Sequence, residues 1–160
     1  MRKIVQIGNN TLREISHDVP VDEIKSTKIQ KIISDMKNAL ASQDDGVAIA
    51  APQIGVNLRI FVVSNKVFET ADAKDEVYIN PKIIKRSRKK NKVEEGCLSV
   101  RGTFGNIVRH EKITIEARNE NGDKITRGGS NLLAQIFQHE TDHLDGVLFV
   151  DNATDLIDVE

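Results

Sequence analysis

Two histidines four residues apart, with a glutamate directly after the first, stand in the segment QHETDH at residues 138–143. On an α-helix, side chains four residues apart lie on one face with Cβ atoms roughly 5–6 Å apart, so His139 and His143 can bind one metal ion. Glu140 can then take a proton from water whose pKa the metal lowers to about 7. The pattern H-E-x-x-H indicates a metal-dependent hydrolase, although a helix with surface histidines would also produce it.

The third ligand must come from upstream. In the longer pattern H-E-x-x-H-x-x-G-x-x-H, the last position is Phe149 here, which cannot bind a metal. The residues after His143 do not form a convincing second helix that could supply a glutamate. The remaining candidates are several carboxylates, His17, His110 and Cys97. Cys97, in EEGCLSV, is favoured because a Cys-His-His set leaves a fourth position open for water, as catalytic sites do. The alternative is a small buried hydrophobe.

A third segment, GVAIAAPQIG at residues 46–55, has too few and wrongly spaced glycines for a dinucleotide-binding loop. Small residues allow a backbone to approach a ligand closely, and an unpaired strand edge can bind an extended peptide as an added strand. Gln53 would supply an amide donor beside it. A packed turn leading into the next strand would also explain this segment.

The elements that position these residues follow from periodicity. Apolar residues recur at helical spacing and predict an amphipathic helix over residues 22–43: Ile29, Ile32, Ile33, Met36 and Leu40. Strands are expected at 58–64, 76–84 and 112–118, and the last is followed by the turn NENGD and a returning strand that begins KIT. A second helix, with Ser130 as candidate cap, carries the histidines and ends near Gly146. This order predicts an α+β fold with an antiparallel sheet.

Composition limits the class of protein. The 160 residues, with 39% hydrophobic and 29% charged, are typical of one soluble domain, here 1–160. The net charge of −1 gives no overall case for nucleic acid or membrane. One cysteine cannot form an internal disulfide, and no secretory signal or membrane span is visible, so an intracellular protein, cytoplasmic or in an organellar matrix, is expected.

The segments GVAIAAPQIG, EGCLS and QHETDH resemble, in order and spacing, the three signature motifs of the peptide deformylases. The resemblance extends over nearly the whole chain. It implies hydrolysis of the formyl group from the initiator methionine of nascent polypeptides. It also implies antiparallel β-sheets around a C-terminal metal-bearing helix, and one divalent metal ion, usually Fe²⁺, with Zn²⁺, Ni²⁺ or Co²⁺ as substitutes.

The resemblance also implies roles for individual residues. Cys97, His139 and His143 would be the metal ligands and Glu140 the general acid/base. The side-chain amide of Gln53 and the backbone N–H of Leu98 would stabilise the oxyanion. The peptide would be held by residues of the three motifs and by one face of the second helix: Gly46, Val47, Ala48, Glu95, Gly96, Leu132, Gln135 and Ile136. Asp142 would orient a ligand, and Arg109 would pair with a carboxylate such as Glu95 or lie in solvent at a strand end.

Departures from the family pattern raise two alternatives. Ala48 stands where a glycine is usual, and its methyl group could weaken peptide binding. Gln135 stands where an aliphatic residue is usual, so its amide must find a partner or make the methionine pocket more polar. A related amidase or peptidase with altered specificity is therefore one alternative, and a noncatalytic metal-binding or peptide-binding relative is the other.

Partners beyond the formylated peptide are suggested only locally. The run KIIKRSRKKNK at 82–92, expected in a hairpin, is either a solvated turn or a patch that contacts ribosomal RNA. The chain ends in the acidic segment NATDLIDVE rather than in a basic helix of the kind that many bacterial deformylases use at the ribosome. A monomer is expected.

Overall fold

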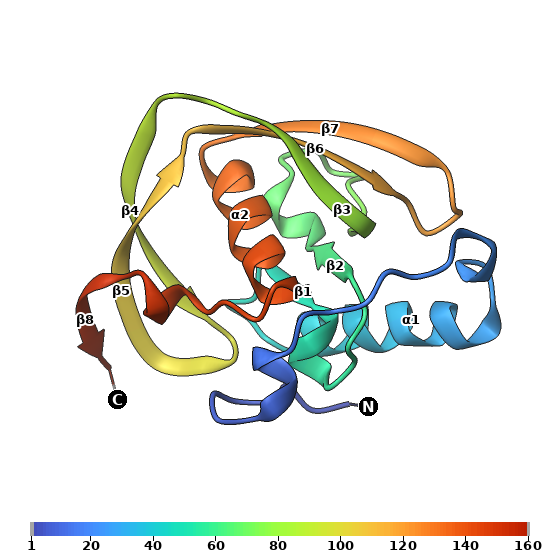
Figure 1. Cartoon of the computed structure of the whole chain (residues 1–160), viewed down its shortest axis with the longest axis horizontal. Helices are drawn as coiled ribbons and strands as arrows, with labels where there is room; N and C mark the ends of the chain where they lie inside the picture. The colour runs from blue at the N-terminus through green and yellow to red at the C-terminus, as the bar shows by residue number, and fades with distance from the viewer. Residues whose placement is uncertain (1, 160) are drawn as a thin grey trace.

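The computed structural model describes residues 2–159, and within them two antiparallel sheets enclose one α-helix (Figure 1). The larger sheet has the strand order β1-β2-β3-β6-β7, formed by Ala48–Ala50, Ile60–Val63, Glu76–Arg86, Lys112–Arg118 and Lys124–Ser130. The smaller sheet has the order β4-β5-β8, formed by Lys90–Cys97, Val100–His110 and Thr154–Asp158. The α+β fold with antiparallel sheets around a C-terminal helix, expected from the sequence, is confirmed.

The enclosed helix, α2, spans Leu132–Leu144 and contacts strands of both sheets. Its apolar side packs on the larger sheet, where the ring of Phe137 meets those of Phe61 and Tyr78 at centroid distances of 6.2 and 5.3 Å. Gly146, just after the helix, has a φ of +76°, and a Cβ there would lie 2.6 Å from a backbone oxygen, so the chain turn requires glycine. Burial of one face thus leaves the histidine-bearing face of α2 toward the space between the sheets.

The other helix, α1, spans Thr27–Ala41 and covers the face of the larger sheet that points away from α2. The prediction that it begins at residue 22 is wrong, because Val21–Glu23 form a separate 3₁₀ turn. The hydroxyl of Ser26 accepts a hydrogen bond from the N–H of Ile29 and caps the helix. The predicted apolar stripe is buried: Ile29, Ile32, Ile33, Met36 and Leu40.

Three further expectations need correction. Ser130 is the last residue of β7, and the cap of α2 is Asn131, whose side chain makes no capping hydrogen bond. Residues 82–92 do not form a hairpin, because β3 pairs with β6 and β4 pairs with β5 in the other sheet. The strand expected at 58–64 is confined to Ile60–Val63. No helix among residues 2–159 is long and apolar enough to span a membrane.

Candidate active site

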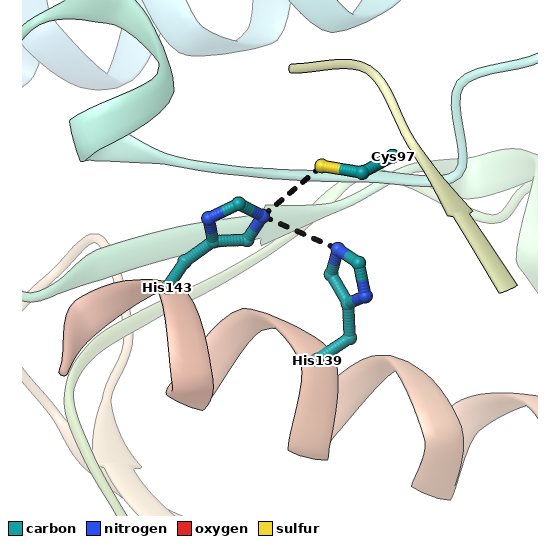
Figure 2. Close-up of side chains that lie close together, drawn as sticks. All are labelled: Cys97, His139 and His143. Carbon is teal, nitrogen blue, oxygen red and sulfur yellow. Dashed lines mark hydrogen bonds between the residues drawn. The ribbon is translucent and has the colours of Figure 1, made fainter. Parts of the chain in front are cut away.

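Three potential metal ligands, one from β4 and two from α2, meet between these elements (Figure 2). Cys97 is the last residue of β4, and His139 and His143 lie on consecutive turns of α2. Cys97 Sγ lies 3.3 Å from His143 Nε2, which lies 3.2 Å from His139 Nε2. The other two histidines are not part of this group: His17 is exposed and its backbone pairs with Leu58, and His110 Nδ1 faces the carbonyl of Ser87.

The spacing of these donor atoms fits a small divalent metal ion. Metal–nitrogen distances of about 2.0–2.1 Å at tetrahedral angles imply a separation of about 3.4 Å between two ligand nitrogens. The histidine nitrogens are 3.2 Å apart. Nδ1 of His139 lies 2.5 Å from Glu95 Oε1, so the ring keeps its proton on Nδ1 and presents Nε2 to the other donors.

The electrostatics of the cluster favour a cation between these donor atoms. Burial lowers the pKa of His139, but Cys97 and Glu95 outweigh burial and hold that pKa well above its usual value. Burial, and then repulsion from His139, hold the pKa of His143 well below its usual value. Nδ1 of His143 is buried without a partner. Two facing imidazoles therefore cannot both be charged, whereas a divalent cation between them interacts favourably with both rings and the sulfur.

Glu140 lies beside this cluster, and one of its carboxylate oxygens, Oε1, is buried without a hydrogen-bond partner in the part of the chain that the structure describes. Its other oxygen lies 3.8 Å from His139 Nε2. Burial raises the pKa of Glu140 to about 7. A carboxyl group with that pKa can both accept and release a proton near neutral pH.

The amide of Gln53 is held in a fixed orientation next to Cys97. Its Oε1 accepts from the N–H of Ala50 at 2.8 Å, which turns Nε2 toward Ser99 Oγ at 3.1 Å and Cys97 Sγ at 3.7 Å. The N–H of Ser99 also donates to Cys97 Sγ, at 3.4 Å. Two hydrogen-bond donors therefore face the sulfur atom through which Cys97 would bind a metal. Sequence reasoning did not find Ser99, because its neighbours in the sequence do not indicate this contact.

A buried ion-pair network joins β4, β5 and α2. Arg109 donates to both oxygens of Glu95, at 2.5 and 3.0 Å, and to Asp142 at 2.8 Å. Burial raises the pKa of Glu95, but hydrogen bonds from His139 and Arg109 outweigh it and lower that pKa to about 2. Of the two positions considered for Arg109, the structure shows the paired and buried one. Asp142 contacts Arg109 rather than a histidine.

A cavity of about 410 Å³ opens above Glu140 and His139 between β1, β4, β5 and α2. Every residue expected to bind substrate or oxyanion contributes to its wall: Gly46, Val47, Ala48, Gln53, Glu95, Gly96, Leu98, Leu132, Gln135 and Ile136. The start of β5 forms a further wall, including Arg101 and Phe104, that sequence reasoning missed. At Gly96 a Cβ would lie 2.7 Å from the Phe104 ring, so any larger residue there would require that ring to move.

Known proteins are similar to this chain in both sequence and fold. Residues 1–158 match the family model described as polypeptide deformylase. Peptide deformylase 2 of Clostridium acetobutylicum is 40% identical over 158 residues, which cover 98% of each chain. The chain belongs to the peptide deformylase family. Membership explains why a cysteine, two histidines and a buried glutamate meet at one cavity, as a metal-dependent hydrolase requires.

Solved structures of peptide deformylases have the same fold as this chain. The enzyme of Legionella pneumophila superimposes with a TM-score of 0.87 at 36% identity, covering 97% of this chain and 87% of that one. The enzyme of Synechococcus elongatus, solved in complex with actinonin, has a TM-score of 0.83 at 32% identity and covers 96% of this chain and 79% of that one.

Proposed function

We propose that this chain, acting as one domain over residues 1–160, removes the N-formyl group from the initiator methionine of nascent polypeptides and releases formate. Membership of the peptide deformylase family supports this activity. The observation that carries it in this chain is the position of Glu140 beside the three potential metal ligands: its Oε2 lies 3.8 Å from His139 Nε2, and its Oε1 is buried without a hydrogen-bond partner among residues 2–159.

Cys97, His139 and His143 would hold the single divalent metal. When bound, the metal would act as a Lewis acid that polarises the formyl carbonyl and lowers the pKa of water enough for it to react at neutral pH. A Cys-His-His set suits Fe²⁺, Zn²⁺, Co²⁺ and Ni²⁺, and we propose Fe²⁺ as the native ion. Metal analysis of protein purified without oxygen, with turnover measured for each reconstituted ion, tests that choice; full activity with zinc and none with iron would overturn it.

Glu140 would move the proton that the reaction requires. The oxygen of water adds to the formyl carbon, and Glu140 accepts the proton released by that water. The bond between the formyl carbon and the amide nitrogen then breaks, and Glu140 passes the proton to the leaving amine. Burial, which raises the pKa of Glu140 to about 7, supports both transfers near neutral pH.

Gln53 and Leu98 would stabilise the negative charge that develops on the formyl oxygen. The bond from the N–H of Ala50 fixes the Gln53 amide at the cavity wall beside Cys97, and Leu98 lines the cavity in the turn after Cys97. Loss of one such donor typically raises the barrier by about 3 kcal/mol.

The peptide would lie between two strand edges. Among residues 2–159, β1 pairs only with β2 and β4 pairs only with β5, so Gly46–Ala48 and Glu95–Gly96 offer backbone groups on opposite walls of the cavity. Leu132, Ile136 and Val47 would contact the methionine side chain. Gln135, which was expected to need a partner, donates to the Glu94 carbonyl and to Glu95 Oε2, both at 3.1 Å.

The basic run at 82–92 would contact ribosomal RNA. Lys82, Lys85, Arg86, Arg88 and Lys90 are exposed, and within residues 2–159 they have no ion-pair partner. Neutralising Arg86, Arg88, Lys89 and Lys90 should weaken ribosome binding and reduce its salt dependence. Unchanged binding and salt dependence would exclude this contact.

The chain would act as a monomer, and sedimentation of the free chain tests this expectation.

Formate release from formyl-Met-Ala-Ser by iron-loaded protein, with Glu140→Gln and an acetylated peptide as controls, tests the activity. Turnover of the formyl peptide by the native protein alone supports the proposal. Comparable turnover of the acetylated peptide would indicate altered acyl specificity, and one bound metal without any turnover would indicate a noncatalytic relative.

A further inference from the structure

Gln135 and His139 contact the same carboxylate from consecutive turns of α2. His139 Nδ1 lies 2.5 Å from Glu95 Oε1, and Gln135 Nε2 donates to Glu95 Oε2 at 3.1 Å. The residues are four apart on the helix, so both side chains lie on one face and reach β4 together. Glu95 therefore joins two turns of the metal-bearing helix to the strand that carries Cys97.

Gln135 completes the hydrogen bonding of this carboxylate. An ionised carboxylate can accept about four hydrogen bonds, two at each oxygen. Oε1 of Glu95 faces His139 Nδ1 and Arg109 Nη2, and Oε2 faces Arg109 Nε and Gln135 Nε2. Without Gln135, Oε2 would keep only the bond from Arg109, and the carboxylate could tilt away from the imidazole.

The second N–H of Gln135 prevents its amide from turning away. It donates to the carbonyl of Glu94, one residue along the same strand, also at 3.1 Å. Both neighbouring groups are acceptors, so the nitrogen rather than the oxygen of the amide must face them. One side chain of α2 is thus fixed to two successive residues of β4, and the Gln135 amide lies against the cavity wall rather than free in the apolar pocket.

We infer that Gln135 is a positioning residue that, by completing the hydrogen bonding of Glu95, holds the His139 imidazole in the orientation that binds the metal. The inference rests on the proposed metal site and adds to it a residue of this chain whose side-chain amide bonds to Glu94 and Glu95 rather than to a metal ligand. An aliphatic residue at this position would fill the same space but leave one carboxylate oxygen with a single donor.

Release of zinc from the zinc-loaded protein to a chromogenic chelator tests the inference without relying on activity. Gln135→Leu removes both donors at similar volume, and Gln135→Glu keeps the shape but replaces the donor with a charge that repels Glu95. Mutation of a group that hydrogen-bonds a metal-bound histidine typically lowers metal affinity 10–100-fold. Gln135 bonds to Glu95, which in turn bonds to His139, so its loss should have a smaller effect and speed zinc release about threefold to tenfold. The effect of Gln135→Glu should be the larger.

Gln30→Leu provides the matched control. The amide of Gln30 also donates two hydrogen bonds, to the carbonyls of Ile24 and Glu120 at 2.9 Å each, but it lies on α1 away from the cavity. Urea unfolding of each metal-free variant measures the general loss of stability. Gln30→Leu should lower stability without changing zinc release, whereas the Gln135 variants should change release.

Two outcomes separate the inference from the proposal on which it depends. Failure of the native protein to bind one zinc ion per chain would overturn the metal site and the inference with it. One bound zinc ion, released at the same rate from the native protein and both Gln135 variants, would overturn the role of Gln135 alone. Equal acceleration by Gln30→Leu would also overturn it, because the effect would then follow stability.

Discussion

Arg109 and Glu95 form a buried ion pair in which the guanidinium donates to both carboxylate oxygens, at 2.5 and 3.0 Å. The pair connects β5 to β4, and through the bond of Glu95 to His139 it connects both strands to α2. The orientation of His139, one of the proposed metal ligands, therefore depends on a charge pair in the smaller sheet.

Arg109→Leu should destabilise the protein by about 3–5 kcal/mol, because it leaves a buried carboxylate without its main partner. Urea unfolding of the metal-free protein measures this change. Glu95→Leu combined with Arg109→Leu should cost less than the sum of the two single variants, since the double variant leaves no unpaired charge at this pair. Additive losses would mean that the two residues do not act as a pair.

The stability of the metal-free protein should fall as pH is lowered from about 4.5 to about 2. The folded-state pKa of Glu95 is about 2 and its ordinary value is 4.5, so the contribution is complete above 4.5 and is lost as pH falls toward 2. This difference in pKa corresponds to a contribution of at most about 3 kcal/mol to the free energy of unfolding. Glu95→Gln should show a shallower decline in the free energy of unfolding over this range; an unchanged decline would assign it to other groups.

Glu140→Gln should lower kcat by about 10²–10⁴-fold, the usual contribution of a general acid/base, while one metal ion per chain remains bound. The amide keeps the size of the side chain but cannot accept and return a proton. Formate release and metal analysis on the same sample measure the two effects, with the exposed and remote Glu23→Gln as control. Loss of the metal together with activity would instead assign Glu140 a part in metal binding.

The sequence predicted the elements that are specified locally. The spacing of His139 and His143 required only the period of a helix, and the strand at 112–118 was marked by alternation and a turn. The start of α1 was misplaced because apolar periodicity does not distinguish a 3₁₀ turn from the first turn of a helix, whereas the Ser26 cap does. The convergence of Cys97 with the histidines was predicted from chemistry rather than from the fold.

The parts that could not be predicted depend on pairing between distant segments. Nothing in the run 82–92 indicates that β3 and β4 belong to different sheets, because the end of β3 and the start of β4 are both rich in Lys and Arg. The cavity wall around Arg101 and Phe104 follows from the pairing of β5 with β4. The partner of Gln135 was unknown for the same reason, since Glu94 and Glu95 come near α2 only when the small sheet forms.

Ala48→Gly should lower stability by about 1–2 kcal/mol and change kcat/KM for formyl-Met-Ala-Ser by less than about threefold. The Ala48 side chain is only 7% exposed and packs in the core cluster that contains Phe61 and Tyr78, so most of its methyl group faces the protein interior. Thermal or urea unfolding and steady-state kinetics measure the two quantities. A tenfold rise in kcat/KM would mean that the methyl group obstructs the peptide.

Asn131→Gly should stabilise the protein by about 1 kcal/mol, because Asn131 has φ 53° and ψ −117°, a conformation that glycine adopts with much less strain. Two backbone bonds hold it there: its N–H donates to the Glu111 carbonyl at 2.9 Å, and its own carbonyl accepts from the N–H of Gln135 at 2.9 Å. Its exposed side chain makes no capping bond, so little is lost with it. Asn131→Ala should destabilise, and an equal effect of the two substitutions on urea unfolding would show that backbone strain at the start of α2 is not what they relieve.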